Sequence, residues 1–142
     1  MSVKQLKIKS LNLSGNLSTL SDLLGEQGVN IRAVCVSQET NDFSYVCIVV
    51  DDTKKAKDAF KAKGVEYTEA DVLAVEMPDH PGGMNAVLKP LKEAKINVIT
   101  LYPYLGRVSN PIMVIEVDNL KLAKDVLTKN WVYVWGKDLY RL

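Results

Sequence analysis

The stretch DHPGGM, residues 79–84, has the clearest potential for ligand chemistry, because it joins a strand-like run to a helix-like run. Its glycines permit a sharp turn and a close approach by another molecule, and Pro81 restricts the turn. The first N–H groups of the helix point back into such a loop, which suits a carboxylate. Asn97, at the start of the next strand, offers a donor and an acceptor. A carboxylate bound by amides and an amine bound by Asn97 and Asp79 would describe a free amino acid.

Catalytic and metal chemistry find little support in the chain. His80 is the only histidine, and no serine or cysteine nucleophile motif accompanies it. An acid–base role for His80 with Asp79 is conceivable because histidine titrates near neutral pH, but one such pair on a loop is a weak case for an enzyme. The phosphate-binding patterns GxxxxGK[ST] and GxGxxG are absent. We therefore expect a protein that is not an enzyme, with no catalytic residue, metal or cofactor.

The composition limits the classes of binding partner and the cellular compartment that we expect for this protein. Eighteen basic and seventeen acidic residues leave a net charge of +1, which provides no field to attract nucleic acid or an acidic membrane. The longest apolar run, residues 45–50, is far too short to span a bilayer, and the first ten residues lack the apolar centre of a signal peptide. Cys35 and Cys47 have no CxxC spacing and fit buried free thiols. These features predict a cytoplasmic protein.

The sequence repeats itself after 67 residues without a gap. Leu6 then falls on Leu73, and the same shift pairs residues of many types along both halves. The other pairs are Gly15 with Gly82, Leu24 with Leu91, Glu26 with Glu93, Asn30 with Asn97, Val50 with Val117, Asp51 with Asp118 and Ala56 with Ala123. The chain is therefore predicted to hold two copies of one unit, residues 1–69 and 70–142, joined near TEAD at residues 68–71 without a flexible linker.

Each copy is expected to fold as β-α-β-β-α-β. In the first, the alternation of residues 6–13 predicts a strand, and leucines at helical spacing predict a helix that Gly28 ends. Residues 30–37 and 43–50 are rich in β-branched side chains, a second helix ends at Gly64, and residues 65–69 form the last strand. The second copy places Trp131 where the first has Gly64. This order predicts an α+β fold of two ferredoxin-like repeats, each an antiparallel sheet with both helices on one face.

Two features predict association. The runs VCIVV and IMVIEV are apolar on both faces of their strands, so the sheets must be covered or continue into one another. In WVYVW, residues 131–135, a strand would direct its three aromatic side chains to one face. We interpret that face as an interface rather than as an aromatic ligand platform, and we expect contact between the copies and a homodimer of chains.

Motifs in both halves resemble those of ACT domains, the small ligand-sensing modules attached to many enzymes of amino-acid biosynthesis. DHPGGM followed by KINVI, and NLSGNL followed by GVNIRAV, are similar to the N-x-P-G-x-L loop and the G-[IV]-N-[IV] turn of that family. The resemblance implies a stand-alone tandem ACT protein that binds an amino acid at an interface between domains. By position, the implied ligand residues are Asp79, His80, Pro81, Gly82, Gly83, Met84 and Asn97 in the second repeat, and Asn12, Ser14, Gly15, Asn16 and Asn30 in the first.

The chain departs from the family pattern at informative places. Ser14 stands where proline is frequent, which makes the first loop less rigid, and Lys95 replaces the glycine before the asparagine turn. Serine-sensing members carry a histidine two residues before the loop asparagine, where this chain has Ser10 and Met77, so serine is not supported as the ligand. Arg107 could neutralise a carboxylate, although a solvated loop charge is the simpler interpretation.

Three functions are consistent with these residues. The first is a regulatory sensor that binds an amino acid or similar metabolite and transmits this to a partner protein by rearrangement of an interface. The second is a structural or regulatory subunit without a ligand, in which the glycines and asparagines serve only turns and caps. The third, which the neutral charge disfavours, is a nucleic-acid-binding ferredoxin-like module that stacks bases on sheet aromatics such as Tyr102 and Tyr104.

Overall fold

A computed structural model describes residues 3–106 and 108–142, and Arg107 lies outside them. The described chain forms two compact units, one of Lys4–Ala70 and the other of Asp71–Leu142 together with Val3. The elements in chain order are β1 (Val3–Leu11), α1 (Asn16–Glu26), β2 (Ile31–Gln38), β3 (Phe43–Val50), α2 (Thr53–Ala62), β4 (Tyr67–Glu76), α3 (Asn85–Glu93), β5 (Val98–Pro103), β6 (Ile112–Val117), α4 (Leu120–Lys129), β7 (Val134–Trp135) and the 3₁₀ helix η1 (Lys137–Arg141). The predicted fold class, two α+β repeats of β-α-β-β-α-β type, is confirmed.

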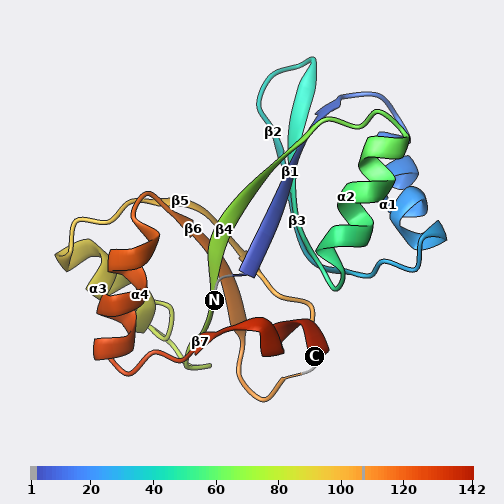
Figure 1. Ribbon diagram of the computed structural model, residues 1–142. Helices are drawn as coiled ribbons and strands as arrows, with labels where there is room; N and C mark the ends of the chain where they lie inside the picture. Colours follow the sequence, from blue (N-terminus) through green and yellow to red (C-terminus); the bar gives the residue numbers. More distant parts are fainter. Residues whose placement is uncertain (1–2, 107) are drawn as a thin grey trace. The chain divides into compact units, whose positions relative to one another are not determined.

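Within each unit the strands that pair with each other are antiparallel, and both helices lie on one face of the sheet. In the first unit β3 pairs with both β1 and β2. In the second, β6 pairs with both β4 and β5, and β7 pairs with β4. Ala74 faces both Val114 of β6 and Trp135 of β7, so β6 and β7 must occupy opposite edges of β4. Figure 1 shows α1 beside α2 and α3 beside α4, each pair against the strands of its own unit.

The hydrophobic cores reproduce the repeat residue by residue. Each of the ten buried residues of the first core has its counterpart 67 positions later in the second core. The pairs are Leu6 and Leu73, Ile8 and Val75, Leu20 and Val87, Leu24 and Leu91, Val29 and Ile96, Val46 and Met113, Ile48 and Ile115, Val50 and Val117, Ala56 and Ala123, and Phe60 and Leu127. Apolar positions alternate in the strands and recur every three or four residues in the helices, so one pattern fills both cores between helices and sheet.

Left-handed backbone positions follow the same register. The described residues with positive φ form three pairs separated by 67: Gly15 with Gly82, Gly28 with Lys95, and Gly64 with Trp131. The last two pairs end helices, and they show that the turn keeps its conformation when glycine is replaced by a larger residue. The predicted substitution of a helix-ending glycine by Trp131 is therefore confirmed, with a φ of 63°. A non-glycine residue in this conformation costs about 1–2 kcal/mol.

Two predicted strands differ in the structure. The predicted final strand of the first copy and first strand of the second form one continuous strand, β4, because Thr68–Asp71 contains no turn-forming glycine, proline or asparagine. The predicted strand 131–135 is wrong over most of its length, because Trp131 ends α4 in a left-handed conformation and only Val134 and Trp135 belong to a strand. The three aromatic side chains therefore do not line one strand face. Tyr102 and Tyr104 are buried, which argues against an aromatic platform for bases.

The left-handed residue after α3 provides a test of this account. Lys95→Gly should stabilise the protein by about 0.5–1 kcal/mol, because relief of the left-handed strain exceeds the additional chain entropy that glycine loses on folding. Lys89→Gly, a matched change inside α3, should destabilise it by about 1 kcal/mol. Urea unfolding of both variants measures the two free energies. Equal destabilisation by both changes would show that the conformation at Lys95 is not strained.

Candidate functional site

The first loop, between β1 and α1, is held by its own hydrogen bonds. Asn16 Nδ2 donates to the carbonyl oxygen of Leu11 at 2.8 Å, and the Asn16 backbone N–H donates to that of Leu13 at 3.2 Å. Gly15, with a φ of 89°, turns the chain into the helix without a side-chain cap. Ser14 and Gly15 are exposed at the tip. The loop therefore has a defined shape without the proline that the family pattern would supply.

Asn12 has a structural role in this loop. Its Nδ2 donates to the carbonyl oxygen of Thr40 at 2.9 Å, and its Oδ1 accepts a hydrogen bond from the buried hydroxyl of Ser44. Its backbone N–H donates to the carbonyl oxygen of Asp42. Asn12 thus ties the end of β1 to the β2–β3 hairpin, and both ends of its side-chain amide are already occupied.

The second loop, residues 77–84, is closed by a series of turns. The N–H of Gly83 donates to His80 O at 2.8 Å, and His80 Nδ1 lies 2.9 Å from Pro81 O. A Cβ atom on Gly83 would lie 1.9 Å from the carbonyl oxygen of Pro78, so a glycine is required there for packing alone. Gly82 has a φ of 80° and open space beside it. Of the two glycines, only Gly82 leaves room for a molecule to approach.

The two helix N-termini differ in a way that the sequence did not predict. At α3 the N–H groups of Asn85, Ala86, Val87 and Leu88 all donate to carbonyl oxygens of Gly82, Gly83 and Met84. At α1 the N–H groups of Leu17 and Ser18 have no acceptor among the described residues. The Met84 N–H, the counterpart of the Leu17 N–H, likewise has no acceptor among the described residues. The two N-termini therefore differ at Ser18 and its counterpart Asn85, and the turns of the second loop use part of the amide cradle expected there.

The asparagines after the first helix of each unit are held by a reciprocal bond to an aspartate. Asn30 N–H donates to Asp51 Oδ1 at 2.9 Å, and Asp51 N–H donates to Asn30 O at 3.1 Å. Asn97 and Asp118 repeat this pair at 3.1 and 3.2 Å. The side chains of both asparagines are exposed and have no hydrogen-bond partner in the described part of the chain. These clasps fix the backbone of each asparagine and leave its amide available.

Sequence reasoning missed the role of the aspartates in these clasps. The cap of α2 is the neighbouring Asp52, whose carboxylate accepts from Lys55 N–H. The repeat contained the necessary signal, because the same shift of 67 residues that aligns Asn30 with Asn97 also aligns Asp51 with Asp118.

Loop and asparagine lie at opposite ends of the sheet within one unit. In the first unit Leu11 faces Phe43 at one end of β3, while Ile31 faces Val50 at the other. In the second, Glu76 faces Ile112 and Val98 faces Val117. At about 3.4 Å per residue the separation along the strand is roughly 17–24 Å. The expected site, in which Asp79, the loop amides and Asn97 hold one amino acid, is therefore not assembled within a single unit.

The family of the chain follows from its full length. Residues 1–142 match a family model described as an ACT domain pair. The chain belongs to the ACT domain pair family. The resemblance seen in the loop and turn motifs is thereby confirmed for both halves. No curated protein matches this ACT domain pair.

Solved structures of similar fold cover almost the whole ACT domain pair. A Bacteroides thetaiotaomicron protein is similar at a TM-score of 0.89 and 29% identity, over 100% of this chain and 98% of that one. The ligand-free regulatory subunit of aspartate kinase from Thermus thermophilus is similar at 0.66 and 12%, over 92% and 91%. The corresponding subunit from Thermus flavus is similar at 0.63 and 12%, over 92% and 94%. At 12% identity the likeness to the two kinase subunits shows the fold alone. In the part of the chain that the structure describes, the helices are too short or too polar to cross a membrane.

Substitution of Asn12 and of its counterpart Asp79 tests whether Asn12 has a structural role or a ligand-binding role. Asn12→Ala should destabilise the protein by about 1–3 kcal/mol, because it leaves the buried Ser44 hydroxyl and a hairpin carbonyl without partners. Asp79→Ala removes an exposed side chain with no partner in the described structure, and should change stability by less than about 0.5 kcal/mol. Urea unfolding would show the difference. A stable Asn12→Ala variant would return Asn12 to the set of ligand residues.

Proposed function

We propose that the protein is a cytoplasmic, non-enzymatic sensor that binds a free amino acid or a similar small metabolite between two copies of the chain. The observation that carries this proposal is the exposed amide of Asn30 and of Asn97, each on a backbone clasped by an aspartate. Such an amide can bind both the amine and the carboxylate of an amino acid. Because the loop of the same unit lies a strand length away, the loop that completes the site would come from a second chain.

Edge strands support association between copies. In each unit one edge of the sheet is free for pairing, β2 in the first and β5 in the second. Val34 and Val36 on β2, and Val98 and Ile99 on β5, are large apolar side chains that are exposed. An edge strand with unpaired backbone groups and exposed apolar side chains is suited to pairing with another chain. These strands directly follow Asn30 and Asn97, so pairing along them would bring a second chain next to each asparagine.

The proposed output is a change in association that a separate protein detects. A ligand that contacts two copies binds the assembled form more tightly than the separate chains, and it therefore shifts the equilibrium towards assembly. A partner protein that distinguishes the two forms would be regulated by the ligand concentration. The regulatory subunits of aspartate kinase with a similar fold support regulation as the general class of function, although they share too little sequence to indicate a ligand.

A subunit without a ligand is the second candidate, and the closed second loop favours it. There the turn bonds use the amides of residues 83 and 85–88, and Gly83 is explained by packing against Pro78. If the first loop is closed by other contacts in the assembled protein, the same description would apply to both units. The protein would then regulate its partner through binding alone.

Thermal unfolding in the presence of each of the twenty free amino acids tests the sensor. A ligand at one hundred times its Kd should add about 2.7 kcal/mol of stability and raise Tm by several degrees. Gel filtration at the same ligand concentration should show a larger assembled fraction. Absence of a shift with every amino acid would favour another metabolite or the subunit without a ligand.

Variants then locate the site. Asn30→Ala and Asn97→Ala should each reduce the ligand-induced Tm shift while the ligand-free Tm changes little, because these side chains make no other hydrogen bond in the described structure. Asn41→Ala, which removes an equally exposed asparagine from the β2–β3 hairpin, is the matched control and should leave the shift intact. A full shift in both Asn30→Ala and Asn97→Ala would place the ligand elsewhere.

A further inference from the structure

Each unit contains a cavity at the same position of the repeat. The cavity of the first unit, about 380 Å³, is lined by residues that include Lys9, Ser10, Thr19, Gly64, Val65 and Glu66. The cavity of the second, about 410 Å³, is lined by side chains that include their counterparts Glu76, Met77, Ala86, Trp131, Val132 and Tyr133. Both lie where the end of the first strand meets the first helix and the segment after the second helix. The backbone therefore forms this cavity twice, and only the side chains differ.

The charged residues that line the two cavities differ: Lys9 and Glu66 line the first, and Glu76 lines the second. In the first unit Lys9 places its ammonium 4.0 Å from the ring centroid of Phe43, a cation–π contact. In the second unit Glu76 replaces Lys9, and Asn110 replaces Phe43 and donates from Nδ2 to Glu76 Oε2 at 3.2 Å. Glu76 is the only charged residue among the described residues that line the second cavity. The lining of the first cavity thus carries one ammonium and one carboxylate, whereas the lining of the second carries a carboxylate and, among the described residues, no cation.

Trp131 is not explained by the fold. It adopts a left-handed conformation that glycine adopts in the first unit without strain, and its side chain is 96% exposed, so it contributes no burial to offset that strain. Backbone strain of this kind is concentrated at functional sites. An aromatic side chain that is strained and exposed beside a cavity is suited to contact a bound molecule.

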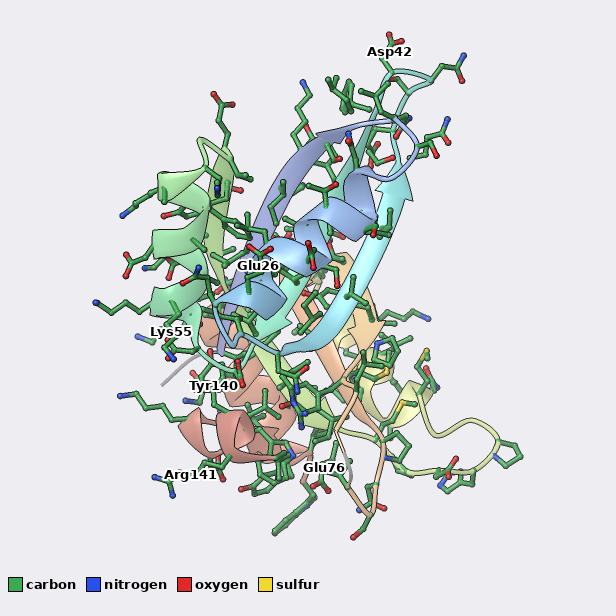
Figure 2. All side chains as sticks on the ribbon, turned by 90° about the vertical axis from the view of Figure 1, so that its right-hand side faces the viewer. Glu26, Asp42, Lys55, Glu76, Tyr140 and Arg141 are labelled. Carbon is green, nitrogen blue, oxygen red and sulfur yellow. The ribbon has the colours of Figure 1, made fainter. Side chains whose placement is uncertain are left out.

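Tyr133 is held next to the carboxylate by two contacts. Its carbonyl oxygen accepts a hydrogen bond from Glu76 N–H at 3.0 Å, and its ring packs edge to face with Trp135 at 5.2 Å between centroids. The Tyr133 side chain is still 52% exposed. Figure 2 shows Glu76 where β4 passes into the following loop. One carboxylate and two accessible aromatic side chains therefore converge on the second cavity.

We propose that this cavity binds a small organic cation, an ammonium or guanidinium group on an apolar stem. The cation would pair with the Glu76 carboxylate and lie against the aromatic rings of Tyr133 and Trp131, an arrangement that favours positive charge. The apolar stem would contact Met77, Ala86 and Val132. An anion would be repelled by Glu76, and a neutral molecule would leave that charge unpaired. The proposal does not depend on the amino-acid site between copies.

The n-pentylammonium ion is a suitable probe, with n-pentanol as its neutral analogue and valerate as its anionic one. Isothermal titration calorimetry of the full chain should show saturable binding of n-pentylammonium, at least tenfold weaker binding of n-pentanol, and none of valerate. Tryptophan emission should shift to shorter wavelength as Trp131 is covered. Equal affinity for the ammonium and the alcohol would show that the cavity binds only the apolar stem, against the proposal. Absence of saturable n-pentylammonium binding would also overturn it.

Three variants assign the binding to this cavity. Glu76→Gln keeps the volume and an acceptor for Asn110 but removes the charge, and should weaken n-pentylammonium binding at least tenfold. Trp131→Gly, which introduces the residue of the first unit, should weaken binding while Tm rises through relief of backbone strain. Lys9→Gln, the matched change in the first cavity, should leave the affinity unchanged. Unaltered affinity in Glu76→Gln, or an equal loss in Lys9→Gln, would exclude the proposed site. A Tm no lower than that of the unchanged protein shows that each variant is folded.

Discussion

The length of one strand separates the two chemical halves of the predicted amino-acid site, and this constraint determines how the protein can bind such a ligand. In a β-α-β unit the loop that leaves the first strand and the turn that enters the second lie at opposite ends of the sheet, because those two strands are parallel in direction. No side chain is long enough to connect them. A ligand that uses both the loop and Asn30 or Asn97 must therefore contact a second unit. Where that unit belongs to another chain, binding and association become one linked equilibrium.

The repeat shows which positions the fold requires and which it leaves free. Both cores keep their apolar residues in register, and both asparagine turns keep the aspartate clasp. The helix-ending positions keep their conformation but not their residue, since Gly28 corresponds to Lys95 and Gly64 to Trp131. Strain of about 1–2 kcal/mol at each position is small enough to be tolerated when other interactions stabilise the unit. Side chains at such positions can therefore carry chemistry that the fold does not need.

Most of the fold could be predicted because core periodicity and the 67-residue register are properties of the sequence itself. The errors came from the ends of elements. Trp131, Tyr133 and Trp135 alternate as in a strand, yet the helix needed a left-handed residue at Trp131, and this outweighed the strand pattern. The site was harder to predict. Asn12 follows strand β1 and Asn97 precedes strand β5. Only the structure shows that the Thr40 carbonyl and Ser44 hydroxyl occupy the amide of Asn12.

Membership in a family of paired domains fixes the backbone of both units but does not make them equivalent in chemistry. The N–H of Ser18 at α1 has no acceptor among the described residues, whereas its counterpart, the N–H of Asn85 at α3, donates to Gly82 O. The first cavity contains Lys9 and Glu66, and the second contains Glu76 and Tyr133 at the same backbone positions. The first lining is neutral overall and the second carries one negative charge, so the second attracts an organic cation more strongly. A duplicated fold can thus keep one backbone while the residues that line its two cavities diverge, so the two cavities need not share a ligand.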